Sequence, residues 1–287
     1  MKIGILTYHC AHNFGAILQA FALQSQLQFM GYDTKIIDYR PQYLDKGYPR
    51  LQYWMFTHGR AWKTIKRYFK ITRKEQKSYK KFISFEKSYM SLTNKCKTPN
   101  ELSEIVNTFD YLILGSDQIW NEKFNGSETL WLGDLKTFNG KIIIYAASTG
   151  DHDFSHPFKK ILKEMLPRYK SISVRESSLI PNLKALTNQN INIETVLDPT
   201  LMVNPQTWNK FRKQIIKEKY ILCYQARKSN DVFRIARSLS KSLNASIISV
   251  DLWDNSFQHD IKNVIASPDE FITLIQNATC VVTTSFH

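Results

Sequence analysis

KIGILTYHCAHNFGAILQAFALQSQLQFMGYDTKIIDYRP, residues 2–41, is the stretch that best indicates the architecture. It opens with an apolar run at 2–7, which is typical of a buried strand. Apolar residues then recur at helical spacing from 14 to 30, and Gly31 follows as a helix stop. Residues 33–39 alternate like a strand, and Pro41 ends them. Strand, helix and strand in this order predict a parallel β-α-β unit.

The same pattern continues along the chain and predicts an α/β protein. Further strands are expected at 111–114, 141–147, 171–174 and 194–197, with helices at 156–166 and 177–185. After Pro205, strands are expected at 220–224, 245–250 and 279–284, and helices at 232–243 and 268–276. We therefore expect two Rossmann-like domains, at 1–204 and 205–287. The chain ends directly after an apolar strand, where a crossover normally follows, so we expect the second domain to be truncated.

Composition narrows the class of protein. The 287 residues include 39 Lys+Arg and 25 Asp+Glu, a net charge of +14, with 43% hydrophobic and 13% aromatic residues. That content excludes a disordered chain. We find no apolar run of about 18 residues, no signal-peptide layout and no metal-ligand spacing among the four cysteines. These features predict a cytoplasmic globular protein without a metal site.

Most of the excess charge lies in one segment. Residues 60–97 contain thirteen basic and two acidic residues, a net +11, within a basic helical insertion near 50–100 of the first domain. Apolar residues recur there at helical spacing, with an interruption near Thr72. One interpretation is a solvated helical face whose aromatic residues pack on the core, and the other is a peripheral contact with anionic lipid on the inner face of the membrane. No nucleic-acid-binding motif is present, so no nucleic acid is expected.

Polar residues follow several predicted strands, where ligands of open α/β sheets bind. Asn13-Phe14-Gly15 opens a helix whose free N–H groups and dipole favour an anion, although Asn13 also suits a simple cap. Gly115-Ser116-Asp117-Gln118-Ile119-Trp120-Asn121 follows residues 111–114. Its carboxylate and amide suit sugar hydroxyls, and its indole suits an apolar sugar face. The alternative is an Asp cap with Trp120 in the core.

Four later segments are also of interest. Ser148 lies among the small residues 146–150, which let a ligand approach the backbone. Arg175 could grip a carboxylate or phosphate, or pair with Glu176 or another acid. Asp198-Pro199-Thr200 predicts a turn at the domain junction, and His287 follows the last strand, where a solvated loop histidine is the alternative.

Six segments in order resemble the polysaccharide pyruvyl transferase family. They are HNFGAILQAFALQ (12–24), LILGSDQIWN (112–121), YAASTG (145–150), SVRE (173–176), VLDPTL (196–201) and TTSFH (283–287). The resemblance implies the fold of two-Rossmann-domain glycosyltransferases, the GT-B type, with the active site in the interdomain cleft. It implies an enzyme that moves a pyruvyl group from phosphoenolpyruvate to two sugar hydroxyls and so forms a cyclic pyruvate ketal.

The resemblance also implies roles for individual residues. The catalytic residues would be His287 and Asp117; the donor-binding residues Arg175, Asn13, Gly15 and Ser285; and the acceptor-binding residues Gln118, Trp120 and Ser148. Ser285 stands where some members have Arg, two places before the histidine. Phosphoenolpyruvate enters as a substrate, and no cofactor is expected.

The expected acceptor is a sugar of a bacterial polysaccharide such as an exopolysaccharide, either free or on a lipid diphosphate carrier. The oligomeric state is left open. One alternative is a nucleotide-sugar-dependent glycosyltransferase on the same fold, although the second domain contains no G-x-G-x-x-G motif. The other is a noncatalytic sugar-binding or polysaccharide-biosynthesis scaffold.

Overall fold

The computed structural model describes residues 1–287 except 45–60, 127, 151–152, 188–189, 251–258 and 286–287, and it describes only the backbone of 61–72. Its internal contacts divide the chain into two compact units. Unit 1 comprises Met1–Lys46 and Tyr89–Asn204, and unit 2 comprises Gly47–Ser88 and Pro205–His287. The later boundary coincides with the one expected from the sequence. The basic segment, however, groups largely with unit 2, whereas the sequence analysis placed it in the first domain.

Unit 1 is built on a six-stranded parallel sheet with the order β2-β1-β3-β4-β5-β6. Its strands are β1 (Lys2–Leu6), β2 (Asp33–Ile36), β3 (Tyr111–Asp117), β4 (Lys141–Ala147), β5 (Tyr169–Val174) and β6 (Ile193–Thr195). In the centre, Ile5 of β1 pairs with Ile36 on one side and Ile113 on the other. These strands are apolar because a parallel sheet is covered on both faces.

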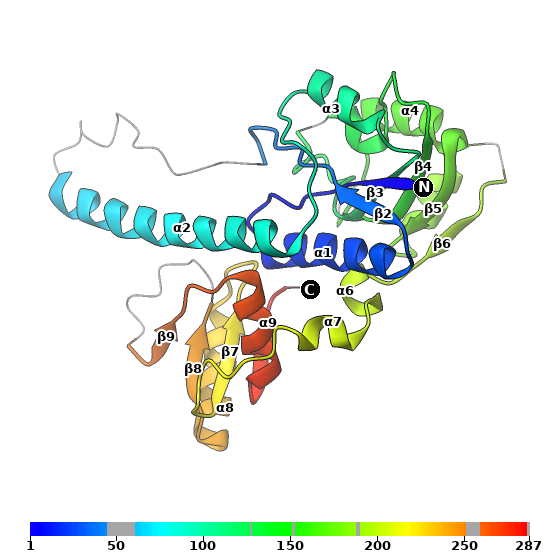
Figure 1. Ribbon diagram of the computed structural model, residues 1–287. Helices are drawn as coiled ribbons and strands as arrows, with labels where there is room; N and C mark the ends of the chain where they lie inside the picture. The colour runs from blue at the N-terminus through cyan, green and yellow to red at the C-terminus, as the bar shows by residue number, and fades with distance from the viewer. Residues whose placement is uncertain (45–60, 127, 151–152, 188–189, 251–258, 286–287) are drawn as a thin grey trace. The chain divides into compact units, whose positions relative to one another are not determined.

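Helices lie on both faces of this sheet (Figure 1). They are α1 (Phe14–Phe29), α3 (Pro99–Val106), α4 (His156–Met165), α5 (Leu179–Lys184) and α6 (Pro199–Met202), with two short 3-10 helices, η2 (Thr129–Leu132) and η3 (Leu166–Arg168). Helix α1 is buried without a break over its first eleven residues, which explains its apolar composition all round. Helix α3 was missed in the sequence, although Thr98 and Glu101 form a capping box at its start.

Unit 2 contains a smaller four-stranded parallel sheet with the order β10-β7-β8-β9. Its strands are β7 (Tyr220–Tyr224), β8 (Ser246–Ser249), β9 (Ile261–Asn263) and β10 (Cys280–Thr283). Its helices are α2 (Ala61–Tyr89), which extends one residue into unit 1, α7 (Pro205–Asn209), α8 (Asn230–Leu243) and α9 (Pro268–Asn277). Two parallel sheets with intervening helices confirm the α/β class.

Helix α2 is continuous, so the interruption expected near Thr72 was wrong. The segment contains neither Gly nor Pro, and nothing else there breaks the backbone ladder. In the part with described side chains, Phe82 and Phe85 are buried, and the Phe85 ring packs 6.0 Å from that of Phe211. The apolar face of this part of α2 therefore belongs to the core of unit 2.

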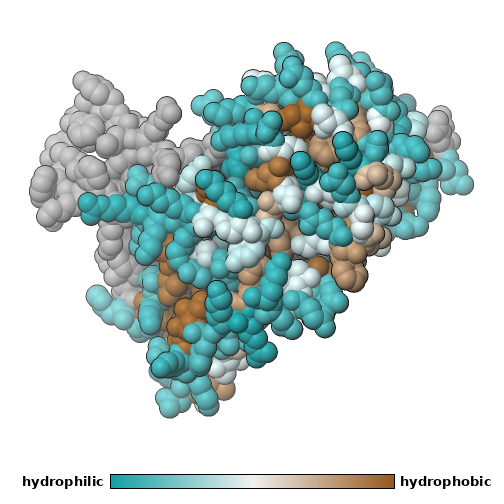
Figure 2. Space-filling view, viewed as in Figure 1, coloured by the Kyte–Doolittle hydropathy of each residue, from teal (hydrophilic) through white to brown (hydrophobic). Residues whose placement is uncertain are grey.

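The face of the molecule seen in Figure 2 is largely polar. Figure 2 shows hydrophilic residues over most of this face, with apolar residues in separate groups between them. Within the part of the chain that the structure describes, no helix is both long enough and apolar enough to cross a bilayer.

Candidate functional site

The candidate site lies at the carboxyl edge of the unit 1 sheet. Because all six strands are parallel, the loops that follow them gather at this edge, where α/β proteins bind ligands. The structure brings seven of the predicted site residues there. They are Asn13, Gly15, Asp117, Gln118, Trp120, Ser148 and Arg175.

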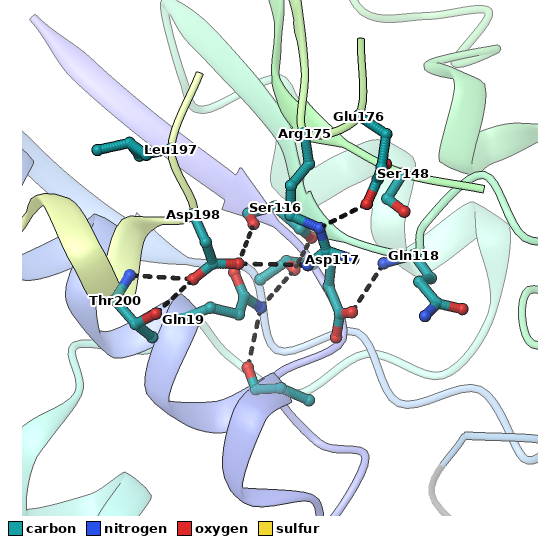
Figure 3. A network of polar contacts seen from close by, with 12 residues as sticks. Gln19, Ser116, Asp117, Gln118, Ser148, Arg175, Glu176, Leu197, Asp198 and Thr200 are labelled. Atoms are coloured by element: carbon teal, nitrogen blue, oxygen red, sulfur yellow. Dashed lines mark hydrogen bonds and ion pairs between the residues drawn. The ribbon is translucent and has the colours of Figure 1, made fainter. Parts of the chain in front are cut away.

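Arg175 is held between two carboxylates (Figure 3). Its Nε donates to Oε1 of Glu176 at 3.0 Å, and its Nη1 donates to Oδ2 of Asp198 at 3.3 Å. The arginine side chain is only 6% exposed. The ion pair considered as an alternative in the sequence is therefore present, and the guanidinium fork is fixed in direction.

Asp198 is the buried centre of this network, with a fully buried side chain. Besides Arg175, its Oδ2 accepts from Oγ of Ser116 at 3.2 Å. Its Oδ1 accepts from the backbone N–H of Thr200 at 3.0 Å and from the Thr200 hydroxyl at 2.7 Å. The predicted turn is thus the start of α6, with Asp198 as its cap and Pro199 in its first turn. Asp directly before Pro was the sequence signal for this helix start.

The carboxyl ends of β3 and β4 have an unusual backbone. Gly115 has φ 112°, and a Cβ there would lie 2.1 Å from the carbonyl oxygen of Tyr145. Asp117 and Ala146, at the ends of β3 and β4, also have positive φ values, of 81° and 47°. Such values are uncommon for residues other than glycine and concentrate at functional sites. They support a functional role for these adjacent strand ends.

Gln118 and Ser148 join the loops after β3 and β4. Ser148 donates its N–H to the Asp117 carbonyl at 3.2 Å, and its Oγ accepts from Gly150 N at 2.9 Å. A Cβ on Gly150 would lie 2.7 Å from Oε1 of Gln118. Gln118 is half-buried, whereas Ser148 is fully buried. Ser148 therefore stabilises the loop, and Gln118 is the most accessible of the three predicted acceptor-binding residues.

Trp120 does not present an open face. It is 1% exposed, and its ring lies edge-on to Phe154 at 6.1 Å. Among the described residues, its Nε1–H has no hydrogen-bond partner. The structure thus places Trp120 in the core, and this burial does not support the predicted stacking on a sugar.

The remaining predicted residues have simpler surroundings. Oδ1 of Asn13 accepts from Ala16 N at 3.2 Å, so Asn13 does cap α1. Ser285 follows β10 in unit 2, and its N–H donates to Oγ1 of Thr283 at 2.9 Å. His287 lies outside the described residues.

Two polar clusters at the same edge were missed in the sequence. The first joins His9, after β1, to Asp38 and Arg40, after β2. Nε2 of His9 lies 2.9 Å from Oδ1 of Asp38, and Nε of Arg40 donates to the same oxygen. Burial favours a raised pKa for Asp38, but the hydrogen bond and charge of His9 and the charge of Arg40 outweigh it and hold the pKa below its ordinary value. The only signal was the position of these residues after adjacent strands.

The second cluster surrounds Glu128. Its Oε2 accepts from the hydroxyls of Tyr39 at 3.0 Å and Tyr43 at 2.7 Å. Nε1 of Trp131 in turn donates to the Tyr43 hydroxyl at 2.8 Å. Burial, together with Glu128, raises the pKa of both tyrosines, so their hydroxyls remain donors at neutral pH. Within the described residues, these clusters included, no group of three or more His, Cys, Asp or Glu side chains is placed to hold a metal ion.

Comparison with solved structures identifies the fold class. The chain is similar to the UDP-GlcNAc 2-epimerase from Methanocaldococcus jannaschii, with a TM-score of 0.51 and 15% identity over 99% of this chain and 79% of that one. It also matches the UDP-GlcNAc 2-epimerase from Neisseria meningitidis bound to UDP-GlcNAc, with a TM-score of 0.49 and 10% identity over 99% and 78% of the two chains. A third match is an α-glucosyltransferase in complex with UDP and DNA, with a TM-score of 0.46 and 15% identity over 99% and 67%. The first similarity supports the GT-B class, with two Rossmann-like domains.

The sequence then gives the family. Residues 13–287 match the model of the polysaccharide pyruvyl transferase family, which covers nearly the whole chain. The chain belongs to this family, and the resemblance found in its six segments is confirmed. A search of curated proteins found no significant match.

Proposed function

We propose that this protein transfers a pyruvyl group from phosphoenolpyruvate to two hydroxyls of a saccharide, forming a cyclic ketal. The observation that carries the proposal is a buried arginine, Arg175, fixed at the same sheet edge as the Asp117 loop. Both residues lie in segments that match the family. A fixed cation near a carboxylate at a strand end suits an anionic donor and a hydroxyl acceptor.

Arg175 is the proposed donor-binding group. Phosphoenolpyruvate carries a carboxylate and a phosphate, and a planar guanidinium binds either one through two parallel hydrogen bonds. Of the two carboxylates that hold Arg175, Glu176 is 36% exposed and Asp198 is fully buried. We expect the donor to displace Glu176, because its contact is the one that solvent reaches. The start of α1 at Asn13 and Gly15, with Ser285, is proposed to complete the anion site.

The chemistry assigns the other residues. A proton added to C3 of phosphoenolpyruvate makes C2 electrophilic, and one sugar hydroxyl forms a bond to C2. A second hydroxyl then forms its own bond to C2 and expels inorganic phosphate, while both hydroxyl protons leave. We assign the acid role to His287 and the removal of a hydroxyl proton to Asp117, which is half-buried at the end of β3. We assign to Gln118 the role of holding a sugar hydroxyl through its carboxamide.

The acceptor is proposed to be a sugar of a bacterial polysaccharide, free or carried on a lipid diphosphate. We propose further that the reaction uses no cofactor and takes place in the cytoplasm, at the inner face of the membrane. The family supports polysaccharide biosynthesis as the setting.

Complementation in the source organism tests the reaction. Deleting the gene should remove one pyruvate ketal per repeat from the surface polysaccharide, as seen by mass spectrometry, and the wild-type gene should restore it. Asp117→Asn and Arg175→Lys should fail to restore it, because an amide is a poor base and Lys cannot reproduce the guanidinium fork. Full restoration by both variants would favour the noncatalytic scaffold.

Donor binding tests the proposal in isolation. Calorimetry should show that phosphoenolpyruvate binds the purified protein and that Arg175→Lys binds it about tenfold or more weakly with little change in melting temperature. UDP-GlcNAc and UDP-glucose serve as comparison ligands. Binding of a UDP-sugar, with none of phosphoenolpyruvate, would favour a glycosyltransferase instead.

A further inference from the structure

We propose that Asp198 is a positioning residue. It fixes the donor-binding Arg175 relative to the acceptor loop, which comprises Ser116, Asp117 and Gln118. The inference rests on the proposed function, since it assigns a role to the surroundings of Arg175. Asp198 is not proposed to touch the substrate or to transfer a proton.

The hydrogen bonds of Asp198 support this distinction. A carboxylate offers about four acceptor positions. Ser116 and Arg175 fill two of them on Oδ2, and the backbone N–H and hydroxyl of Thr200 fill two on Oδ1. Because the side chain is fully buried, it has neither a spare acceptor position nor access to solvent. Such a group acts through the partners that it holds.

Two of these partners link the donor and the acceptor of the proposed reaction: Arg175 is the donor-binding residue, and Ser116 belongs to the acceptor loop. Arg175 follows β5, and Ser116 directly precedes Asp117 at the end of β3 (Figure 3). The carbonyl of Ser116 also accepts from Oγ1 of Thr7 at 2.9 Å, and Thr7 accepts from Nε2 of Gln19 at 2.9 Å. One continuous network therefore runs from α1 through β1 and β3 to Asp198 and on to β5.

Replacing Asp198 by asparagine separates its two roles, which are to cap α6 and to hold Arg175. Asn caps a helix about as well as Asp, and its Oδ1 can still accept from Thr200 N. Its Nδ2 then faces Arg175 and Ser116. The serine hydroxyl can rotate to accept, but a guanidinium has no acceptor. Asp198→Asn should therefore keep the start of α6 and lose the hold on Arg175.

The first test measures coupling in donor binding. Calorimetry with phosphoenolpyruvate should show Asp198→Asn binding about tenfold more weakly than wild type. The double variant Arg175→Lys/Asp198→Asn should bind no more weakly than Arg175→Lys alone, because Asp198 affects donor binding only through the guanidinium. Thr98→Ala, which removes the cap of α3 in the same unit, is the control for lost stability and should bind like wild type. If the double variant lost affinity by the product of the two single losses, the proposal would be overturned.

The second test does not depend on the reaction. Phenylglyoxal modifies accessible arginines, and peptide mass spectrometry reports the rate at Arg175. Asp198→Asn should raise this rate about fivefold or more, whereas Glu176→Gln should change it less than about twofold, because Asp198 still holds the buried side chain. An unchanged rate in Asp198→Asn, or an equal rise in Glu176→Gln, would overturn the proposal. Should Asp198→Asn not fold, the Glu176→Gln result decides it. If the wild-type protein does not bind phosphoenolpyruvate, the proposed function is wrong. The phenylglyoxal rates would still show whether Asp198 holds Arg175.

Discussion

At the scale of single residues, Asp38 shows how burial and charge together set stability. Its carboxylate accepts from both His9 and Arg40 in a buried cluster. Those partners lower its pKa against the opposing effect of burial. A lowered folded-state pKa means that the group contributes its full stability above its ordinary, unfolded-state pKa, and that this contribution is lost as the pH falls through the folded-state value.

We expect Asp38→Asn to lower the free energy of unfolding by about 3 kcal/mol at neutral pH, because it leaves Arg40 and His9 without their buried carboxylate. Urea unfolding from pH 7 to pH 3 measures this loss. The gap between wild type and variant should narrow below about pH 4. Asp33→Asn, at an exposed position, is the control and should change little. A gap that stays constant down to pH 3 would contradict the assignment.

The burial of Trp120 gives a second prediction at the scale of single residues. Because it is buried against Phe154, we expect Trp120→Ala to destabilise the fold by about 3–5 kcal/mol. Trp120→Phe should cost much less, since it keeps a ring and no described group bonds the indole N–H. Denaturant unfolding measures both. If Trp120→Phe were fully stable and yet bound a saccharide acceptor more weakly, the stacking role predicted from the sequence would be restored.

At the scale of elements, Glu270 links helix α9 to helix α2. It accepts from Ser267 N at 2.8 Å in a capping box, and it also pairs with Lys81. Desolvation raises its pKa, but the bonds from Lys81 and Ser267 outweigh this and lower the pKa below its ordinary value. Its contribution to stability is therefore present at neutral pH and is lost as the pH falls through the lowered value.

Two substitutions separate these roles of Glu270. Gln also serves in a capping box, so Glu270→Gln removes only the ion pair with Lys81. It should lower the free energy of unfolding by about 0.5 kcal/mol, and by less at high salt. Glu270→Ala removes the cap as well and should cost about 1 kcal/mol more. Thermal unfolding across a salt series measures both, with Lys80→Ala on the exposed side of α2 as the control. Equal losses in Gln and Ala would mean that the capping box contributes nothing.

At the scale of the whole molecule, the net charge of +14 predicts attraction to anionic surfaces. The described part of α2 buries Phe82 and Phe85, while Lys77, Lys80 and Lys87 are exposed. Basic residues near an anionic bilayer contribute up to about 1 kcal/mol each, with strong salt dependence. The buried apolar face also explains why the described part of this helix needs no lipid to cover it.

We expect the protein to sediment with phosphatidylserine-containing vesicles at low salt and not with neutral ones. Replacing Lys77, Lys80 and Lys87 together by Glu should abolish sedimentation. The matched control makes the same change of charge at three exposed lysines of α4, namely Lys159, Lys160 and Lys163. Equal losses in both triple variants would assign the effect to net charge rather than to α2, and indifference to lipid charge would remove the membrane contact altogether.

The order of elements in both units could be predicted from the sequence, because periodicity, caps and glycine stops are local signals. The strands at 141–147 and 220–224 were predicted to the residue, and both are apolar runs between clear breaks. The gathering of Asp117, Gln118 and Arg175 at one edge followed in the same way, since parallel strands all end on one side. Short or irregular elements such as α3 and β9 were missed, because few residues carry their pattern.

The partners of the site residues followed only from tertiary packing. Arg175 meets Asp198 across 23 positions, and Ser116 meets the same carboxylate across 82, because the sheet order sets β5 next to β6 and folds the β3 loop toward them. The burial of Trp120 and the grouping of α2 largely with unit 2 have the same origin. The periodicity of apolar residues along a helix or strand determines which face each side chain lies on. Its neighbours on that face come from distant segments, whose placement depends on the packing of the whole unit.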